Sequence, residues 1–196
     1  SSLSDINTLL NAIANNETSH DITIAQFAVN DETIDMTELA ASIDSYDTLN
    51  AAKTAKMTLA SGATINVDSS EVSHMLADET ANRLEISDQK IVVNPAATIS
   101  VSTANLLDAT TTGTITASIA TDSTVESLKS LTGTNNAYTI VIAEADATGV
   151  TAADLNTIEQ LTTAAVDASA VTSLAQDSIG NIATLLEAGN NTSSFT

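Results

Sequence analysis

Short runs of β-branched and aliphatic residues alternate along the chain with stretches of helical periodicity, and this alternation restricts the fold more than any other feature. Most of the runs place an apolar residue at every second position, which is typical of half-buried β-strands. Because parallel strands need long crossover connections, usually helices, the alternation predicts an α/β fold with parallel strands. The expected strands are residues 21–29, 56–60, 63–67, 83–87, 90–93, 98–102, 114–118, 138–143 and 164–168.

Apolar residues at intervals of three and four mark the expected helices. The stripes are Ile6, Leu9, Leu10 and Ile13; Met36, Leu39, Ala40 and Ile43; Val125, Leu128 and Leu131; Leu155, Ile158 and Leu161; and Ile179, Ile182, Leu185 and Leu186, with Val101, Leu106 and Leu107 expected in a further one. Helix positions that we expect to correspond recur after roughly 22–30 residues, in the range of solenoid repeats. They are Leu76, Leu106, Leu128, Leu155 and Ile182.

This recurrence predicts a repetitive, solenoid-like stack of short parallel strands alternating with short helices, in which each unit buries the apolar face of the next. A core of Ala, Val, Ile and Leu, with 2% aromatic residues overall, suits such thin layers. We expect one repetitive module over residues 1–196, a fragment of a longer chain, with approximate units 1–54, 55–82, 83–112, 113–136, 137–163 and 164–196. A single compact α/β or α+β domain would give the same pattern and is the alternative.

The charge of the chain is strongly negative, with 25 Asp and Glu residues against 5 Lys and Arg and a formal net charge of −20. This balance argues against binding to nucleic acid and to anionic membrane surfaces, both of which need basic residues. Because no apolar run is long enough to cross a bilayer, we also expect no membrane span. An acidic surface attracts cations, so it suits either solubility in salty surroundings or a need for divalent ions.

Four pairs of residues place a Ser, Thr or Asp three positions before an acid at the start of a helical stripe: Ser2 and Asp5, Asp35 and Glu38, Ser123 and Glu126, and Thr151 and Asp154. In such a capping box the first side chain accepts from a free N–H of the first turn, and the acid reaches back. Asp5 and Asp154 begin the similar segments DINTLL and DLNTIEQL, which raises the question of a duplicated site. Capping explains both acids without a ligand, and we expect Asn156 to face solvent.

An Asp followed by Ala or Ser and then by Ser or Thr also recurs. One interpretation is an Asx turn, in which the carboxylate accepts from the backbone two residues on. The other is a row of carboxylates that collects calcium on one face of the stack. Because calcium takes about 6–8 oxygen ligands, neighbouring repeats would have to share an ion. The candidate ligands are Asp68, Asp108, Asp122, Asp146 and Asp167.

Familiar catalytic motifs are missing from the sequence. The two histidines, His20 and His74, cannot supply a three-histidine zinc site, and there is no cysteine. No H-E-x-x-H, G-x-S-x-G, G-x-G-x-x-G or P-loop sequence occurs. A glycosidase-like pair of carboxylates is available among the many acids, but the few aromatic residues offer little surface on which a sugar could stack. We therefore expect that the protein is not an enzyme and that His74 is an exposed helix residue.

Residues 145–174, ADATGVTAADLNTIEQLTTAAVDASAVTSL, resemble repeats of very large secreted bacterial proteins of the RTX or hemolysin-like kind, frequent in marine bacteria including cyanobacteria. Residues 150–158 and 167–172 carry the match, which is weaker over 98–131. The resemblance implies an extracellular, repetitive, surface-associated protein. It implies no calcium ligands, because the chain has no Gly-Gly pair and so lacks the glycine-rich nonapeptide of that family.

Together these features predict a non-enzymatic structural module of a large exported bacterial surface protein, serving as a stalk, a surface-layer block or an adhesin segment. Its expected partners are adjacent repeats of the same chain, with self-association or cell-surface glycans as further partners. The alternatives are a calcium- or glycan-binding module and a segment of a phage fibre.

Overall fold

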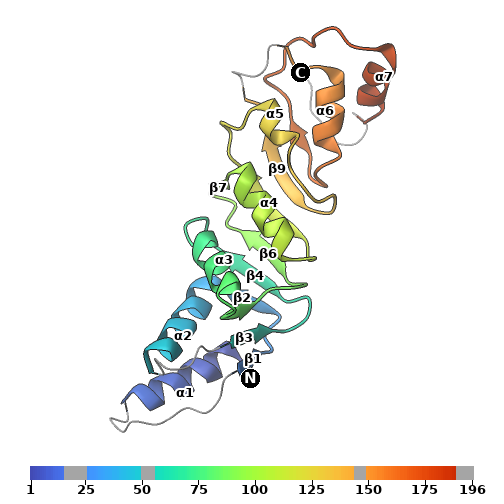
Figure 1. The fold of residues 1–196 in the computed structure, drawn as a ribbon. Coiled ribbons are helices and arrows are strands. Elements are labelled where there is room, and N and C mark those ends of the chain that lie inside the picture. Colours follow the sequence, from blue (N-terminus) through green and yellow to red (C-terminus); the bar gives the residue numbers. More distant parts are fainter. Residues whose placement is uncertain (16–25, 50–55, 144–148, 189–196) are drawn as a thin grey trace. The chain divides into compact units, whose positions relative to one another are not determined.

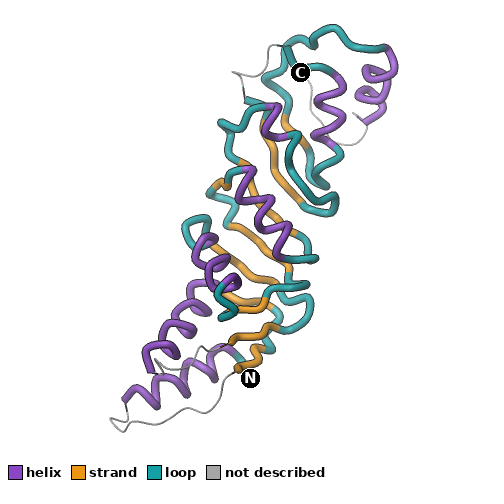
Figure 2. The backbone as a smooth tube through the Cα atoms, viewed as in Figure 1, coloured by secondary structure: helices purple, strands orange, loops and turns teal. Residues whose placement is uncertain are grey.

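The structure is a computed structural model that describes residues 1–15, 26–49, 56–143 and 149–188 (Figure 1). It divides into two compact units. Unit 1 comprises Ser1–Asn94 with Thr110–Gly113, and unit 2 comprises Pro95–Ala109 with Thr114–Thr196. In both units short strands alternate with helices along the chain, as the tube in Figure 2 shows.

Unit 1 contains two sets of parallel strands and three helices in its described residues. The elements are α1 (Leu3–Asn15), β1 (Gln26–Val29), β2 (Thr33–Asp35), α2 (Met36–Leu49), β3 (Lys56–Leu59), β4 (Thr64–Val67), α3 (Val72–Thr80), β5 (Leu84–Glu85) and β6 (Lys90–Val93). The strands lie in the orders β1-β3-β5 and β2-β4-β6. Ile65 pairs with Ile34 on one side and with Ile91 on the other, and all three are buried. The same face of each strand therefore supplies the core.

Unit 2 repeats a simpler pattern of one strand followed by one helix. Its elements are β7 (Thr98–Ile99), α4 (Val101–Thr110, whose last residue belongs to unit 1), β8 (Ile115–Ile119), α5 (Val125–Leu128), β9 (Ala137–Val141), α6 (Ala152–Glu159), β10 (Val166–Asp167) and α7 (Ile179–Ala188). Strands β8, β9 and β10 lie in that order, and β7 pairs with β8. These pairs are all parallel, and each joins strands that are consecutive in the sequence.

The prediction of an α/β fold with parallel strands is confirmed, and most expected strands are present. The run 98–102 is wrong at its end: β7 stops at Ile99, because Ser100 caps α4 by accepting from the Thr103 N–H at 3.1 Å. Strand β2 was not expected, since Ile34 is the one aliphatic residue among its three. Residues 21–25 of the first expected strand lie outside the described residues.

The helices bury the same positions, counted from the residue that caps them. The first and fourth helical residues share one face, and this face is buried in α1, α2, α3, α4 and α6; the pairs are Leu3 and Ile6, Met36 and Leu39, Val72 and Met75, Val101 and Ala104, and Ala152 and Leu155. The prediction that Leu76 and Leu106 are corresponding core positions is wrong. Leu106 is 58% exposed, and the equivalent core positions are Met75 and Ala104.

The stripe expected in α1 is also broken, since Leu9 is 43% exposed while Ile6 and Leu10 are buried. Among the described residues, no helix combines the length and apolar character needed to cross a bilayer.

Candidate functional site

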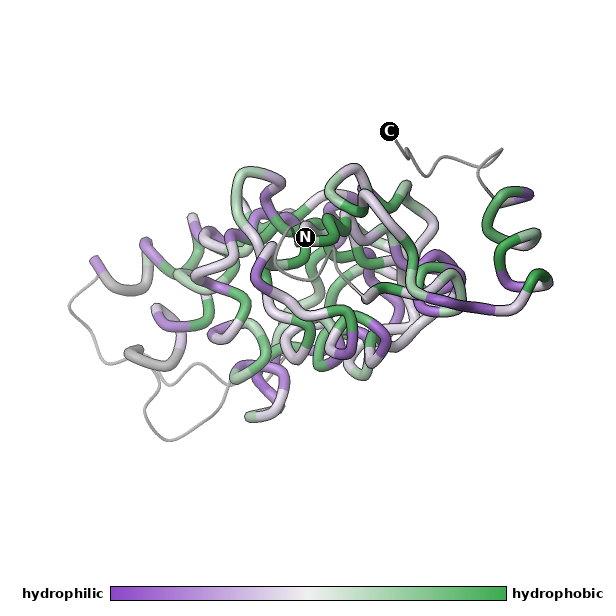
Figure 3. The backbone as a smooth tube through the Cα atoms, turned by 90° about the horizontal axis from the view of Figure 1, so that it is seen from above, coloured by the Kyte–Doolittle hydropathy of each residue, from purple (hydrophilic) through white to green (hydrophobic). Residues whose placement is uncertain are grey.

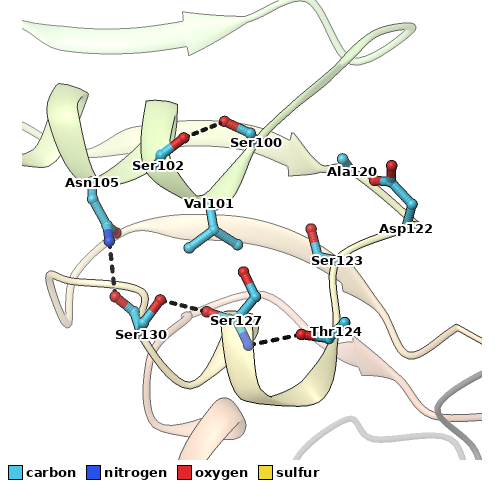
Figure 4. Close-up of a pocket in the computed structure, with 10 residues that line it drawn as sticks. All are labelled: Ser100, Val101, Ser102, Asn105, Ala120, Asp122, Ser123, Thr124, Ser127 and Ser130. Atoms are coloured by element: carbon cyan, nitrogen blue, oxygen red, sulfur yellow. Dashed lines mark hydrogen bonds between the residues drawn. The ribbon is translucent and has the colours of Figure 1, made fainter.

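A shallow hollow of about 430 Å³ opens in unit 2, where the first turn of α4 faces the turn after β8 and the short helix α5 (Figure 4). Hydroxyl side chains form most of its lining. The lining residues are Ser100, Val101, Ser102, Asn105, Ala120, Asp122, Ser123, Thr124, Ser127 and Ser130. The site therefore offers many neutral hydrogen-bonding groups around a small apolar patch.

Helix capping explains why hydroxyls gather at this hollow. The Ser100 side-chain oxygen caps α4 and lies 2.8 Å from the Ser102 hydroxyl. The Thr124 hydroxyl caps α5 by accepting from the Ser127 N–H at 3.1 Å. Because two successive helices begin beside the hollow and each needs a side-chain oxygen at its start, their caps also line it.

The expected capping box of Ser123 and Glu126 is wrong by one residue. Thr124 is the cap of α5, and its extended backbone precedes the first helical residue. The Glu126 carboxylate instead pairs with the Lys129 ammonium at 2.9 Å. Because Ser123 and Thr124 both carry a hydroxyl, the sequence alone did not decide which of them caps the helix.

The hollow can recognise a neutral hydroxylated molecule more readily than it can catalyse a reaction. Its serine and threonine hydroxyls can donate and accept hydrogen bonds, and Val101 and Ala120 provide apolar contact. Asp122 is the one ionisable residue in the lining, so the hollow holds no pair of titratable groups for acid and base catalysis.

The capping boxes of α1 and α6 are confirmed. In α6 the Thr151 hydroxyl accepts from the Asp154 N–H, and the Asp154 carboxylate accepts from the Thr151 N–H, both at 3.1 Å. In α1 Ser2 and Asp5 exchange the same two bonds, also at 3.1 Å. The bonds from Ser2 hold the pKa of Asp5 below its ordinary value.

The start of α2 fits the predicted cap in part. The Asp35 carboxylate accepts from the Thr37 N–H at 2.9 Å and from the Glu38 N–H at 3.3 Å. Glu38 turns toward α1, where it accepts from the Asn7 amide at 3.1 Å.

The asparagines of the two similar segments connect successive helices. Asn156, the fifth residue of α6, donates to the carbonyl of Asn181 in α7 at 2.9 Å, so the expectation that it faces solvent is wrong. Asn7, the fifth residue of α1, donates to Glu38 in α2 and accepts from the Ser42 hydroxyl at 2.5 Å. The duplicated motif thus places an amide where it can bond to the helix that follows.

Asn105 occupies the same fifth position in α4 and makes the same kind of link. Its amide donates to the Ser130 carbonyl at 2.8 Å, and its side-chain oxygen accepts from the Thr132 N–H at 2.9 Å. The sequence did not single out Asn105, because the residues around it do not resemble the other two segments. Its spacing from the cap, Ser100, is the signal that could have identified it.

The structure distributes the five candidate calcium ligands over several places. Asp68, in unit 1, accepts from the Asn94 amide at 2.8 Å. Asp122 lies at the edge of the hollow in unit 2. Asp167, at the end of β10, accepts from the Ser169 N–H at 2.9 Å, which is the Asx turn predicted there. Hydrogen bonds from Ser169 also hold the pKa of Asp167 below its ordinary value. Asp146 lies outside the described residues.

Asp108, the remaining candidate, is part of a polar network between α4 and β9. Its carboxylate accepts from the Asn136 amide at 2.8 Å, and Asn136 accepts from the Ile115 N–H at 2.9 Å. Burial and the nearby Asp108 charge raise the pKa of Tyr138 well above its ordinary value. Gly133, with φ of +79°, packs against Asp108 so closely that a Cβ there would clash with the carboxylate.

Within the described ranges, no three His, Cys, Asp or Glu side chains come together in a group that could hold a metal ion. Three of the candidate carboxylates, those of Asp68, Asp108 and Asp167, instead accept from a donor in their own surroundings. A shared calcium site remains a prediction.

A second cluster of charged groups lies in α3 around Asp78, whose side chain is 1% exposed. The Arg83 guanidinium donates to one carboxylate oxygen at 2.5 and 3.0 Å. The other oxygen of the Asp78 carboxylate is buried and lies 3.7 Å from His74. The His74 side chain is 41% exposed, as expected for a surface helix residue. Asp44 of α2 approaches the same guanidinium at 3.6 Å. The ion pair of Arg83 and Asp78 is the centre of this cluster, which lies within unit 1.

No family model, curated protein or solved structure matches the chain.

Proposed function

We propose that the chain is a non-enzymatic structural module of repeated strand–helix units, stacked as a solenoid within a large exported bacterial surface protein. In this role it serves as a stalk, a surface-layer block or an adhesin segment. Each repeat buries the apolar face of its neighbour, so the module holds an extended shape.

The observation that carries this proposal is the asparagine at the fifth position of a helix. In α1, α4 and α6 this side chain bonds to the next helix or to the turn just after it, over separations of 25 to 35 residues. A bond repeated at the same position has the character of a connector between units, because a binding site would present the amide to a ligand. The parallel pairing of consecutive strands supports the same arrangement.

The resemblance of residues 145–174 to repeats of secreted bacterial proteins supports the assignment to a cell surface. The net charge of −20 suits a protein exposed to salty surroundings, where dissolved ions screen its self-repulsion. Controlled digestion of intact cells that make the native protein tests this location, since a surface protein is cleaved while cytoplasmic proteins remain whole.

Small-angle X-ray scattering tests the solenoid against a compact domain. A compact 196-residue protein has a radius of gyration of about 16 Å. We expect a clearly larger radius, above about 20 Å, with a distance distribution skewed toward long distances. A monomer at about 16 Å would contradict the stacked arrangement, and a stable trimer in the same sample would favour a phage fibre.

A glycan-binding role is a second candidate, favoured by the hydroxyl-lined hollow of unit 2. Nuclear magnetic resonance titration with neutral oligosaccharides tests it, with amide shifts read at Ser102, Ser123 and Ser127. Binding should move these signals and should weaken in Ser127→Val. The matched control is Thr37→Val, a hydroxyl in unit 1 that contacts Glu71. Absence of shifts at millimolar sugar would eliminate this candidate.

A further inference from the structure

The last helix, α7, carries the most exposed large apolar side chains of the described residues. Ile179 is 86% exposed, Leu186 72% and Ile182 37%. The helix includes a single charged residue, Glu187, in a chain with 25 acids. Figure 3 shows this helix, at the right of the view, coloured mostly as hydrophobic. The surface is thus both apolar and poor in charge.

The exposed residues occupy positions that other helices bury. Ser178 caps α7 by accepting from the Asn181 N–H at 3.1 Å, which makes Ile179 and Ile182 the first and fourth helical residues. In α6 the same positions are Ala152 and Leu155, at 0% and 3% exposure. The next residue of the face, Leu185, is 5% exposed in α7. The inner face of α7 therefore has the layout of a core face and is covered at one end.

Strand β10 offers a free edge close in sequence to this helix. It pairs with β9 through Val166 and Asp167 and is the last strand of its sheet in the part of the chain that the structure describes. Each earlier strand of unit 2 has the strand of the following repeat beside it, in parallel. The pattern that would continue the sheet, and cover the helix, is one more strand followed by a helix.

We propose that α7 and the free edge of β10 form a docking surface for one further strand–helix repeat of the kind formed by residues 137–159. This inference rests on the proposed function as a repeat array. The added strand pairs in parallel with β10, and its aliphatic residues cover Ile179 and Ile182. A second copy of the chain is a poorer match, because the inner face of its first helix, Leu3 and Ile6, is already buried.

The test extends the full chain after Thr196 with a copy of its own residues 137–159. Eight residues separate α5 from β9, and residues 189–196 give the added strand the same spacing from α7. Hydrogen exchange then measures the protection of backbone amides in β10 and α7. We expect protection to rise at least about tenfold, since a paired and covered element opens less often.

The control extension has the same amino acids in scrambled order and should give no gain. Ile179→Asn combined with Ile182→Asn should abolish the gain in the extended chain. In the parent chain, where Ile179 is 86% and Ile182 37% exposed, the same pair should leave protection of β9 unchanged.

Several outcomes would overturn the proposal. One is an extension that adds no protection, or a scrambled extension that adds the same. Another is a parent chain that sediments as a dimer through Ile179, because the occupant would then be a second copy. A third is loss of α7 protection after removal of residues 189–196, because those residues would already cover the face. Scattering from the parent chain separates these failures from failure of the array itself, since an elongated monomer keeps the proposed function whatever the extension does.

Discussion

Single hydroxyl and carboxylate side chains determine where the helices of this chain begin, and through that which residues become core. Thr151 and Asp154 satisfy two backbone N–H groups at the start of α6, and Ala152 and Leu155 are then directed inward. Helices α4, α5 and α7 are capped in a similar way by the side chains of Ser100, Thr124 and Ser178. Each side chain accepts from the N–H three residues on, but no acid stands there to complete a capping box. The burial pattern of each of these helices is therefore counted from its cap.

Thr124 and its neighbour Ser123 allow this role to be tested with a matched pair. We expect Thr124→Ala to lower the free energy of unfolding by about 1 kcal/mol, because the Ser127 N–H loses its partner at the start of a four-residue helix. Ser123→Ala should change it by less than about 0.5 kcal/mol. Urea unfolding of both variants measures the difference, and equal losses would contradict the assignment of the cap.

The sequence predicted the capping boxes at Ser2 and Thr151 but missed what the neighbouring asparagines do. A cap acts within one turn, so its partners can be read three residues away. The partners of Asn7, Asn105 and Asn156 lie 25 to 35 residues further along the chain. Which residue they reach depends on the lengths of the intervening loops and on strand register, and these are not visible in the local pattern.

At the scale of elements, β-branched runs predicted the strands well because a short strand in a thin core must supply aliphatic residues on its inner face. The prediction failed where a cap or a very short element decided the outcome, at residues 101–102 and in β2. The helical stripes identified the helices but misjudged Leu9, which follows the spacing and yet points outward, and Leu106, which was expected in the stripe of α4 and is exposed. The direction of a helix face is set by packing against strands, and spacing alone leaves it open.

Helix α3 departs from the other helices because a carboxylate occupies its inner face. Asp78 is the seventh helical residue of α3 and is buried. The seventh residues of α4 and α6 are Leu107 and Ile158, which are buried and apolar. The Arg83 guanidinium compensates this buried charge. A charged pair at a core position stabilises the fold little in itself, because both groups lose hydration.

We therefore expect Arg83→Met to cost about 3 kcal/mol in the free energy of unfolding, because it leaves the buried Asp78 without its guanidinium partner. The double variant Asp78→Leu with Arg83→Met should recover most of this loss, since it replaces the pair by apolar side chains of similar size. Urea unfolding of the two proteins is the measurement. A double variant as unstable as the single one would show that the pair positions α3 in a way that packing cannot replace.

The end of α5 is joined to the start of α6 by an ion pair that makes stability depend on pH. Lys129 lies 2.9 Å from the Asp154 carboxylate. Partial burial acts to raise the pKa of Asp154, but hydrogen bonds from Lys129 and Thr151 outweigh it and hold the pKa below its ordinary value. A lowered pKa in the folded state means that this contribution is present above about pH 4 and is lost as the pH falls below that value.

Asp154→Asn tests this dependence, because the amide keeps the size of the side chain and removes its charge. We expect the variant to be less stable than the parent chain by about 0.5 kcal/mol at neutral pH. The difference should shrink as the pH falls through the lowered pKa, and urea midpoints at pH 7 and near pH 2.5 measure it. A difference that is the same at both values would mean that the charge of Asp154 contributes nothing.

For the whole molecule, the net charge of −20 makes stability depend on salt. The sequence has 5 Lys and Arg residues against 25 Asp and Glu, so negative charge stays in large excess even though Arg83, Lys56 and Lys129 form ion pairs with Asp78, Glu85, Glu126 and Asp154. This excess of carboxylates makes the folded chain repel itself. Salt screens this repulsion, since the Debye length falls from about 20 Å at 0.02 M to about 4 Å at 0.5 M.

The melting temperature should therefore rise by several degrees when sodium chloride is raised over that range. Calcium chloride at about 5 mM should raise it no more than sodium chloride of equal ionic strength, because a built site needs about 6–8 oxygen ligands and no three acids of the described residues gather. An additional rise with calcium that Asp108→Asn or Asp167→Asn removes would instead establish the shared ion site. Asp5→Asn is the control for such a rise, because Asp5 lies in a capping box at the start of α1. The comparison thus separates a surface that attracts cations generally from one that binds a particular ion.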